Sequence, residues 1–332
     1  MSNLNMEMKT TIATASLAHT HKDVLTDSID KGLVQRRFDR HAHEYDQYAE
    51  VQKQMADQLA EHIKAAMPPI HNNSTSLRIL DIGCGTGMLT ERLMRTYPQS
   101  HVTLLDLSPR MLEQALAKLN HIGIQASAVE VIAEDAETWA ERAGRLRHEG
   151  KEDVLPKNKQ NAACAQVEAS FDLIVSSAAF QWFNRPDETL TALCSLLRPG
   201  GVLAFATFMP GTLGELHAAF AAAEAALGLP PSPRGQSYPT GHDWSRWCAS
   251  PTVARPLNWE ERCYTHRYSS TDAMLRHVRR IGAGNAVVGR SAAPNRALHA
   301  RWQAEYAARF SASDGSVPAS YYVGYGLLHM DT

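Results

Sequence analysis

The spacing of apolar positions changes along the chain and divides it into segments. Between 33 and 66 the apolar residues recur at helical spacing, as Val34 and Phe38 do. Pro, Asn and Ser residues at 68–76 end that pattern. We therefore predict a helical N-terminal cover over 33–66, preceded by a disordered tail over 1–30.

Short apolar runs then alternate with helical patterns. The runs that we predict as strands cover 78–82, 102–107, 128–133, 171–176 and 202–208. The helices predicted between them cover 88–97, 138–147 and 186–197, and one more begins at Pro109 after the N-cap residue Ser108. Strands that are apolar throughout and joined by helices are typical of a parallel sheet with both faces covered.

The pattern changes again in two later segments. The segment 141–170 is charged and poorly periodic, and we predict a surface insertion there. The segment 228–258 is rich in Pro, Gly, Ser and Trp, and we predict that it forms a cap, or lid, over a site at the strand ends. Strand patterns at 259–268 and 321–328, with a helical one at 272–281, are expected to extend one edge of the sheet.

These segments together predict a single α/β domain over 31–332. Its core is expected to be a Rossmann-like, seven-stranded, mostly parallel sheet with helices on both faces. The 332 residues are 44% hydrophobic, which is enough for a sizeable core. The tail, the insertion and the cap account for the remaining length without a second domain.

The first predicted strand runs directly into the loop Gly83-Cys84-Gly85-Thr86-Gly87. Glycine lets a backbone approach a ligand closely, and the carboxyl edge of a parallel sheet is where open α/β folds bind ligands. The G-x-G-x-G spacing differs from the dinucleotide motif G-x-G-x-x-G, and the phosphate-loop motif is absent. The loop therefore indicates a nucleoside-like ligand held without a pyrophosphate cradle.

This loop, with Asp106 at the end of the second strand, resembles that of the class I S-adenosylmethionine-dependent methyltransferases. The resemblance implies that Asp81 orders the loop or contacts the methionine amino group, that Asp106 accepts from both ribose hydroxyls, and that Asp135 meets the adenine amino group. It places the cofactor, and the product S-adenosylhomocysteine, among Asp81, Gly83, Cys84, Gly85, Gly87, Asp106, Leu107, Met111, Glu134, Asp135, Ala136, Ser176 and Ser177. Each acid alone is typical of a loop cap or a solvated charge, but features at the ends of four consecutive strands favour a cofactor site.

Three further segments, 34–58, 171–182 and 203–216, are similar to the malonyl-acyl-carrier-protein O-methyltransferase family of biotin biosynthesis. They contain the Gln181-Trp182 pair and the run Pro210-Gly211-Thr212-Leu213. The resemblance implies transfer of a methyl group to the free carboxylate of a malonyl thioester. The thioester is carried by acyl carrier protein or by coenzyme A.

A carboxylate acceptor is ionised at pH 7 and needs no general base. The resemblance therefore implies catalysis by positioning, without a metal ion. Tyr45 and Gln52, two helical turns apart, are expected on one face over the cofactor. Tyr45 and Gln181 are the catalytic candidates, with core packing as the other interpretation of Tyr45. Trp182 is expected to line the substrate pocket or to belong to the core.

Charge bears on the partners that the chain can bind. Lys and Arg number 33 against 35 Asp and Glu, and the formal net charge of -2 argues against a nucleic-acid-binding surface. The implied carrier protein is acidic, and we expect it to meet Arg276, Arg279 and Arg280 on consecutive helical turns. A solvated helix face is the alternative for these three residues.

The cysteine pattern and the length of the apolar stretches bear on location. Five Cys without C-x-x-C spacing argue against disulfides and a zinc site, and favour a cytoplasmic protein. No apolar stretch is long enough to span a membrane. We expect a monomer.

Two other functions are compatible with the same motifs. A methyltransferase of another small acid or of a quinone precursor would share the loop, Asp106 and Asp135. A non-catalytic protein that binds S-adenosylmethionine would also keep Asp81 and the glycines. A nucleic-acid N-methyltransferase is disfavoured, because the fourth strand ends in Ser-Ser-Ala-Ala and not in an Asn/Asp-Pro-Pro-Tyr/Phe motif.

Overall fold

The computed structural model describes residues 28–67, 76–148, 171–232, 235–249, 258–282, 286–287 and 296–331. Nearly all of the predicted tail over 1–30 lies outside the described residues, and so does most of the predicted insertion over 141–170. The fold and the site below are built from the described ranges.

One seven-stranded sheet runs through these ranges in the order β3-β2-β1-β4-β5-β7-β6. Its strands are β1 (Arg78–Ile82), β2 (His101–Asp106), β3 (Val129–Ala133), β4 (Phe171–Ser177), β5 (Leu197–Phe208), β6 (Asn258–Tyr268) and β7 (Val317–His329). Strands β1 to β5 are parallel, whereas β7 pairs antiparallel with both β5 and β6. The predicted α/β sheet with two late strands at one edge is confirmed.

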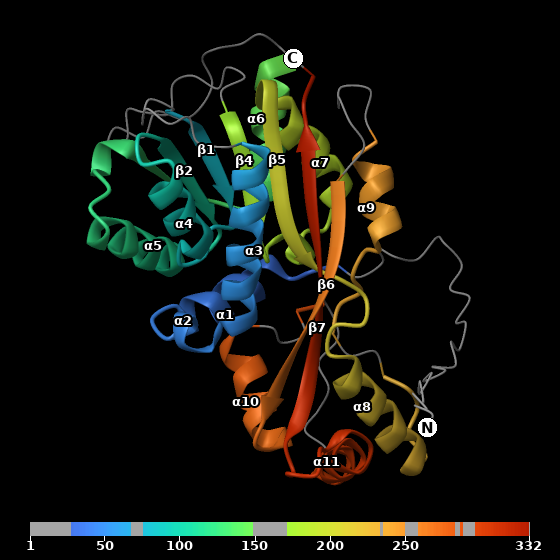
Figure 1. Ribbon diagram of the computed structural model, residues 1–332. Helices are drawn as coiled ribbons and strands as arrows, with labels where there is room; N and C mark the ends of the chain where they lie inside the picture. Colours follow the sequence, from blue (N-terminus) through green and yellow to red (C-terminus); the bar gives the residue numbers. More distant parts are fainter. Residues whose placement is uncertain are drawn as a thin grey trace, which may run out of the picture.

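Three helices stand where the sequence predicted one helical segment. They are α1 (Lys31–His41), α2 (Tyr45–Tyr48) and α3 (Glu50–Ala66). Ala49, with φ -86° and ψ 47°, leaves the helical region, so the chain turns between α2 and α3. Helix α3 then lies in front of the sheet in Figure 1, packed on β4, β5 and β7, and buries Met55, Leu59 and Ile63.

The remaining helices cover the two faces of the sheet and its lower end. They are α4 (Met88–Thr96), α5 (Pro109–His121), α6 (Ala136–His148), α7 (Pro186–Ser195), α8 (Gly214–Ala226), α9 (Gly241–Trp247), α10 (Thr271–Arg280) and α11 (Arg296–Phe310), with 3-10 turns η1 (Ala126–Ala128) and η2 (Phe180–Trp182). In β1, Ile79 faces the core beneath α3, α4 and α5, and Leu80 faces the core beneath α6, α7 and α9, because strand residues alternate. Figure 1 shows β6 and β7 continuing past the other strands towards α8, α10 and α11.

Helix α9 falls inside the segment predicted as a cap, 228–258. Its N-terminus is fixed by a capping box between Thr240 and Asp243. Trp244 is fully buried, with its ring centroid 5.0 Å from that of Phe205 in β5. This part of the predicted cap therefore belongs to the core and is not a mobile cover.

Candidate active site

A cavity lies between α1, α2 and α3 and the carboxyl ends of the central strands. It sits where the strand order reverses around β1, which is where open α/β sheets bind ligands. The predicted residues on its wall are Tyr45, Gln52, Asp81, Gly83, Cys84, Gly85, Asp106, Leu107, Met111, Asp135, Ala136, Ser177 and Trp182. Predicted residues of the N-terminal helices and predicted residues at the strand ends therefore line the same cavity.

The glycine loop turns tightly between β1 and α4. Gly83 has φ +63°, a left-handed conformation that costs other residues strain, and its N–H donates to the carbonyl of Leu105 over 2.7 Å. A Cβ at Gly83 would lie 2.4 Å from the Cβ of Ala179. At Gly85 a Cβ would meet nothing within 4 Å, so the loop leaves open space on that side.

Asp106 ends β2 on the cavity wall and ties the loop to the next helix. Its Oδ2 accepts from the N–H of Gly85, and its Oδ1 accepts from the N–H of Ser108, each over 2.8 Å. Burial raises the pKa of Asp106 to about 6, although these two backbone hydrogen bonds lower it. The carboxylate is therefore mostly ionised at pH 7 and keeps one lone pair on each oxygen for a ligand.

Asp81 lies deeper, at 1% exposure. Its Oδ2 accepts from the hydroxyl of Thr90 on α4 over 2.5 Å, which fixes the start of that helix against β1. Burial raises the pKa of Asp81 to about 7, and the neighbouring Asp106 adds to the rise. Asp81 therefore orders the loop through α4 while it also lines the cavity.

Asp135 is held by partners on two sides. Lys31 at the start of α1 places its Nζ 2.8 Å from Oδ2, and the N–H and hydroxyl of Thr138 donate to Oδ1. Burial raises the pKa of Asp135, but Lys31 and Thr138 outweigh it and hold the pKa below its ordinary value. Lys31 also reaches Glu137 at 2.6 Å, so it closes the cavity as part of an ion-paired cluster.

Tyr45 and Gln52 both line the cavity, but not for the reason that the sequence suggested. Tyr45 begins α2 and Gln52 lies in α3, and the turn at Ala49 separates them. The prediction that the two residues share one helix face was therefore wrong. Burial raises the pKa of Tyr45, and Asp46 and Asp106 raise it further, so its hydroxyl stays protonated. Gln52 is 7% exposed, and its Oε1 has no hydrogen-bond partner among the described residues.

A second cavity adjoins the first. The two share Phe38, Tyr45, Gln52, Ala178 and Trp182. The remaining residues on the wall of the second cavity are Gln181, Phe208, Thr212, Leu213, Gly235, Gln236, Tyr238, Ile281 and Tyr321. The run 210–213 that the sequence singled out therefore contributes Thr212 and Leu213 to this wall.

Gln181 acts on the backbone that separates the two cavities. Its Nε2 donates to the carbonyl of Ala178 over 2.5 Å, and its Oε1 lies 3.5 Å from the hydroxyl of Thr207. Ala178 has φ +57°, a left-handed conformation that is strained for a residue with a Cβ. We infer that Gln181 is a positioning residue that holds this turn, since its side-chain amide is already bonded to protein.

Three predicted cofactor residues lie outside the first cavity. Ser176 is buried and donates its hydroxyl to the carbonyl of Ile82 over 2.9 Å, and the next residue along β4, Ser177, lines the cavity in its place. Glu134 forms a two-pronged ion pair with Arg142 at 2.5 and 2.7 Å. Gly87, the N-cap residue of α4, has φ +76°, and a Cβ there would meet the Cβ of Ala115 at 3.1 Å.

The three arginines of α10 line neither cavity. Arg276 and Arg279 are exposed. Arg280 donates to Oε2 of Glu44 over 2.7 Å and to the hydroxyl of Tyr48 over 2.6 Å, and its guanidinium lies 4.7 Å from the Tyr48 ring centroid. Arg280 therefore ties α10 to α2.

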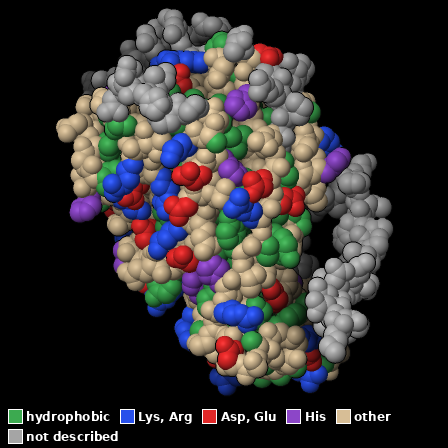
Figure 2. Space-filling view, viewed as in Figure 1, with side chains coloured by type: hydrophobic (Ala, Val, Ile, Leu, Met, Phe, Trp, Pro, Cys, Tyr) green, Lys and Arg blue, Asp and Glu red, His purple; other side chains and the backbone are tan. Residues whose placement is uncertain are grey.

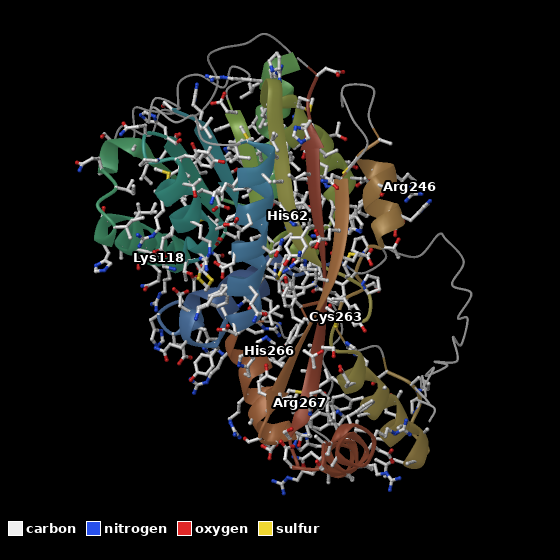
Figure 3. All side chains as sticks on the ribbon, in the orientation of Figure 1. His62, Lys118, Arg246, Cys263, His266 and Arg267 are labelled. Carbon is white, nitrogen blue, oxygen red and sulfur yellow. The ribbon has the colours of Figure 1, made fainter. Side chains whose placement is uncertain are left out.

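The sequence did not identify Lys31, Val34 or Phe38 of α1 as residues of the cavity wall. Val34 and Phe38 recur four residues apart, which marks one helix face but not what that face covers. Asp46 was missed as well: its carboxylate accepts from the Thr86 hydroxyl over 2.6 Å and from Nζ of Lys118 over 2.7 Å. Lys118, labelled in Figure 3 on α5, thus links the N-terminal helices to the glycine loop.

The described residues contain neither a candidate metal cluster nor a candidate membrane-spanning helix. No group of three or more His, Cys, Asp or Glu side chains among them is placed to hold a metal ion. No helix in the described part of the chain is long and apolar enough to cross a membrane.

The chain is similar to proteins of known class. Residues 80–203 match a family model described as a methyltransferase domain. The chain is 33% identical over 294 residues to the malonyl-(acyl-carrier protein) O-methyltransferase of Paenibacillus sp. (strain JDR-2). This match covers 86% of this chain and 95% of that protein. It is 33% identical over 264 residues to the enzyme of the same name in Priestia megaterium, over 78% of this chain and 83% of the relative.

Solved structures show the same fold at lower identity. The YcgJ protein of Bacillus subtilis matches with a TM-score of 0.50 at 13% identity, over 83% of this chain and 99% of that one. A protein of Bacillus halodurans C-125 matches with a TM-score of 0.50 at 16% identity, over 83% and 100% of the two chains. These structures show the fold, and the sequence relatives above, which match over most of both chains, show that this chain belongs to the malonyl-acyl-carrier-protein O-methyltransferase family.

Proposed function

We propose that the protein transfers the methyl group of S-adenosylmethionine to the free carboxylate of malonyl-acyl carrier protein. The product is the malonyl methyl ester that primes the early, pimeloyl stage of biotin biosynthesis. The observation that carries the proposal is the pair of cavities that meet at Tyr45, Gln52 and Trp182. A donor in the first cavity and an acceptor in the second would meet there.

The first cavity fits an adenosyl cofactor with an amino-acid end. Each oxygen of Asp106 accepts one backbone hydrogen bond and retains a lone pair, which suits the two hydroxyls of a ribose. The buried Oε1 of Gln52 has no partner among the described residues, which suits an ammonium group. When bound, the cofactor supplies an activated methyl group on a positively charged sulfur.

The side chains of this protein then have little proton chemistry to do. The acceptor carboxylate is ionised at neutral pH, so no side chain has to remove a proton. Val34, Phe38 and Trp182 make the wall largely apolar and exclude water from the junction. Holding the acceptor in line with the methyl group can lower the barrier by roughly 7–11 kcal/mol.

Tyr45 and Gln181 contribute in different ways. Tyr45 keeps its proton and offers a neutral hydroxyl at the junction of the two cavities. Gln181 holds the strained turn at Ala178, which forms part of both walls. Tyr45 is therefore proposed to contact the reacting groups, and Gln181 to position the turn beside them.

The carrier protein is proposed to dock at α10, where Arg276 and Arg279 are exposed. Ile281, directly after this helix, lines the second cavity, so a carrier bound there would stand next to the acceptor site. Figure 2 shows Lys and Arg interspersed with Asp and Glu over the middle of one face, and the formal net charge of the chain is -2. A local basic face is enough to attract an acidic partner.

A competition assay tests the choice of substrate. Purified protein with methyl-labelled S-adenosylmethionine is offered malonyl-acyl carrier protein, malonyl-coenzyme A, free malonate and a quinone precursor. We expect the largest specificity constant for the carrier-bound thioester. Preferential labelling of a free acid or a quinone precursor would contradict the proposal, and cofactor binding without label transfer to any of them would indicate a binding protein.

A further inference from the structure

The second cavity is uncharged on every side that the structure describes. Its described wall contains no Asp, Glu, Lys, Arg or His. The polar groups are tyrosine and threonine hydroxyls and glutamine amides, among them Tyr45, Gln52, Tyr238 and Tyr321. Burial raises the pKa of Tyr238 to about 12 and that of Tyr321 well above its ordinary value, so these hydroxyls are neutral donors.

Two cations on the elements around this cavity, Lys31 and Arg280, are engaged in ion pairs. Lys31 is paired with Asp135 and Glu137 on the wall of the first cavity. Arg280 is paired with Glu44. Neither side chain lies on the described wall of the second cavity, so neither is placed to pair directly with a carboxylate bound there.

This lining poses an electrostatic problem for a carboxylate substrate. A buried charge is costly unless an opposite charge or several hydrogen bonds compensate for it. Neutral donors such as Gln52 compensate in part, and two opposite charges a few ångströms apart attract strongly where water is excluded. A carboxylate therefore binds well in this cavity only if its counter-charge comes from something other than the described wall.

We propose that the protein leaves that counter-charge to the sulfonium of the cofactor, so that the acceptor carboxylate binds tightly only when a cationic donor fills the first cavity. The inference rests on the proposed function. Gln52, which lies on both walls, is assigned as the residue that bridges the two ligands. Its amide can accept from the ammonium group and donate to the carboxylate.

The same arrangement favours release of the products. Transfer forms one O–C bond and breaks one S–C bond, whose electron pair stays on sulfur, so the negative and the positive charge both disappear. The neutral ester then faces a neutral wall and a neutral thioether. Because the attraction is present only before transfer, the cavity discriminates between the acid and its ester.

Calorimetry tests the inference without turnover. Malonyl-pantetheine is titrated into protein saturated with sinefungin, whose protonated amine stands in place of the sulfonium, or with uncharged S-adenosylhomocysteine. We expect binding about tenfold tighter, or more, with sinefungin, and no difference for the methyl ester of malonyl-pantetheine. Equal affinities for the acid in the two complexes, or no binding in either, would overturn the inference.

Three variants test whether the cofactor or a side chain of the protein supplies the counter-charge. Gln52→Glu adds a competing negative charge at the junction and is expected to abolish the sinefungin-dependent gain, whereas Gln52→Leu keeps most of it. Arg234→Ala, at a position outside the described residues, is expected to leave the gain unchanged. If Arg234→Ala weakens binding of malonyl-pantetheine equally in both complexes, a protein cation supplies the counter-charge and the inference is wrong. Turnover of malonyl-acyl carrier protein, measured in parallel, shows independently whether the proposed function holds.

Discussion

The backbone N–H of Gly85 donates to Oδ2 of Asp106 over 2.8 Å and joins the glycine loop to the end of the neighbouring strand. The same carboxylate accepts from the N–H of Ser108 through its other oxygen. One acid thus fixes the loop after β1 and the start of α5, and it presents its remaining lone pairs to the first cavity.

Replacing Asp106 with Asn should weaken cofactor binding. The amide keeps the shape but loses the negative charge and one acceptor oxygen, and hydrogen bonds to charged groups are worth about 1.5–3 kcal/mol. We expect the dissociation constant of S-adenosylhomocysteine, measured by calorimetry, to rise at least about tenfold. Glu113→Gln, an exposed change on α5, is the matched control and should leave it unaltered. An unchanged constant in Asp106→Asn would exclude the proposed contact.

Cofactor affinity should depend on pH in the range where Asp106 titrates. Burial raises its pKa to about 6, so the carboxylate that accepts hydrogen bonds is present above that pH and is lost below it. The affinity for S-adenosylhomocysteine should therefore fall as the pH drops from 7 through about 6. The Asp106→Asn variant should lack this step, and a step of the same size in both proteins would assign it to another group.

Gly83→Ala should destabilise the protein by steric overlap as well as by backbone strain. The added Cβ would lie 2.4 Å from that of Ala179, in a residue with φ +63°. Gly123→Ala is a matched control, because Gly123 also has a positive φ, +82°, but a Cβ there meets nothing within 4 Å. We expect Gly123→Ala to cost about 1 kcal/mol and Gly83→Ala clearly more, measured by urea unfolding. Equal losses would show that the contact with Ala179 relaxes freely.

Gln181→Leu should lower kcat while the affinity for cofactor changes little. The substitution removes the amide that donates to the Ala178 carbonyl and so releases the turn between the cavities. Ala178→Gly should restore part of the activity, because glycine adopts φ +57° without the steric cost of roughly 1–2 kcal/mol. A purely structural effect of Gln181→Leu would lower stability without this rescue. Turnover and unfolding are therefore measured on each single variant and on the double variant.

Arg276→Ala combined with Arg279→Ala should raise KM for malonyl-acyl carrier protein and leave KM for malonyl-pantetheine unchanged. Both arginines are exposed on α10, and rim charges act mainly on association with a charged partner. Arg301→Ala with Arg309→Ala on α11 is the control, because both of these side chains pair with Glu305. If the two double variants behave alike, the carrier docks elsewhere.

Local sequence signals predicted the sheet and the loop well. The apolar run 78–82 matches β1 in both bounds, and Ser108 caps α5 with its side chain, as the Ser-Pro pair indicated. These features depend on neighbours in the chain. Helix α11 was missed because its apolar residues do not follow one clear face, and Trp302 is buried in the core, where it stacks on Phe220 of the distant helix α8.

Side-chain direction limited the prediction of the site. Ser176 and Ser177 end the same strand, but only Ser177 lines the cavity, since adjacent residues point to opposite faces. Tyr45 and Gln52 reach the cavity through a turn at Ala49 that the apolar spacing did not reveal. Arg280 forms an ion pair with Glu44 although more than two hundred positions separate the two residues. No local pattern encodes such a contact.

The most direct test of the account is a mass measurement on the acceptor. Malonyl-acyl carrier protein is incubated with the purified protein and S-adenosylmethionine, and the intact carrier is weighed by mass spectrometry before and after. The account predicts the addition of a single methyl group, which is absent when the carrier bears an acetyl group. An unchanged mass, under conditions in which calorimetry shows the cofactor to be bound, would contradict it.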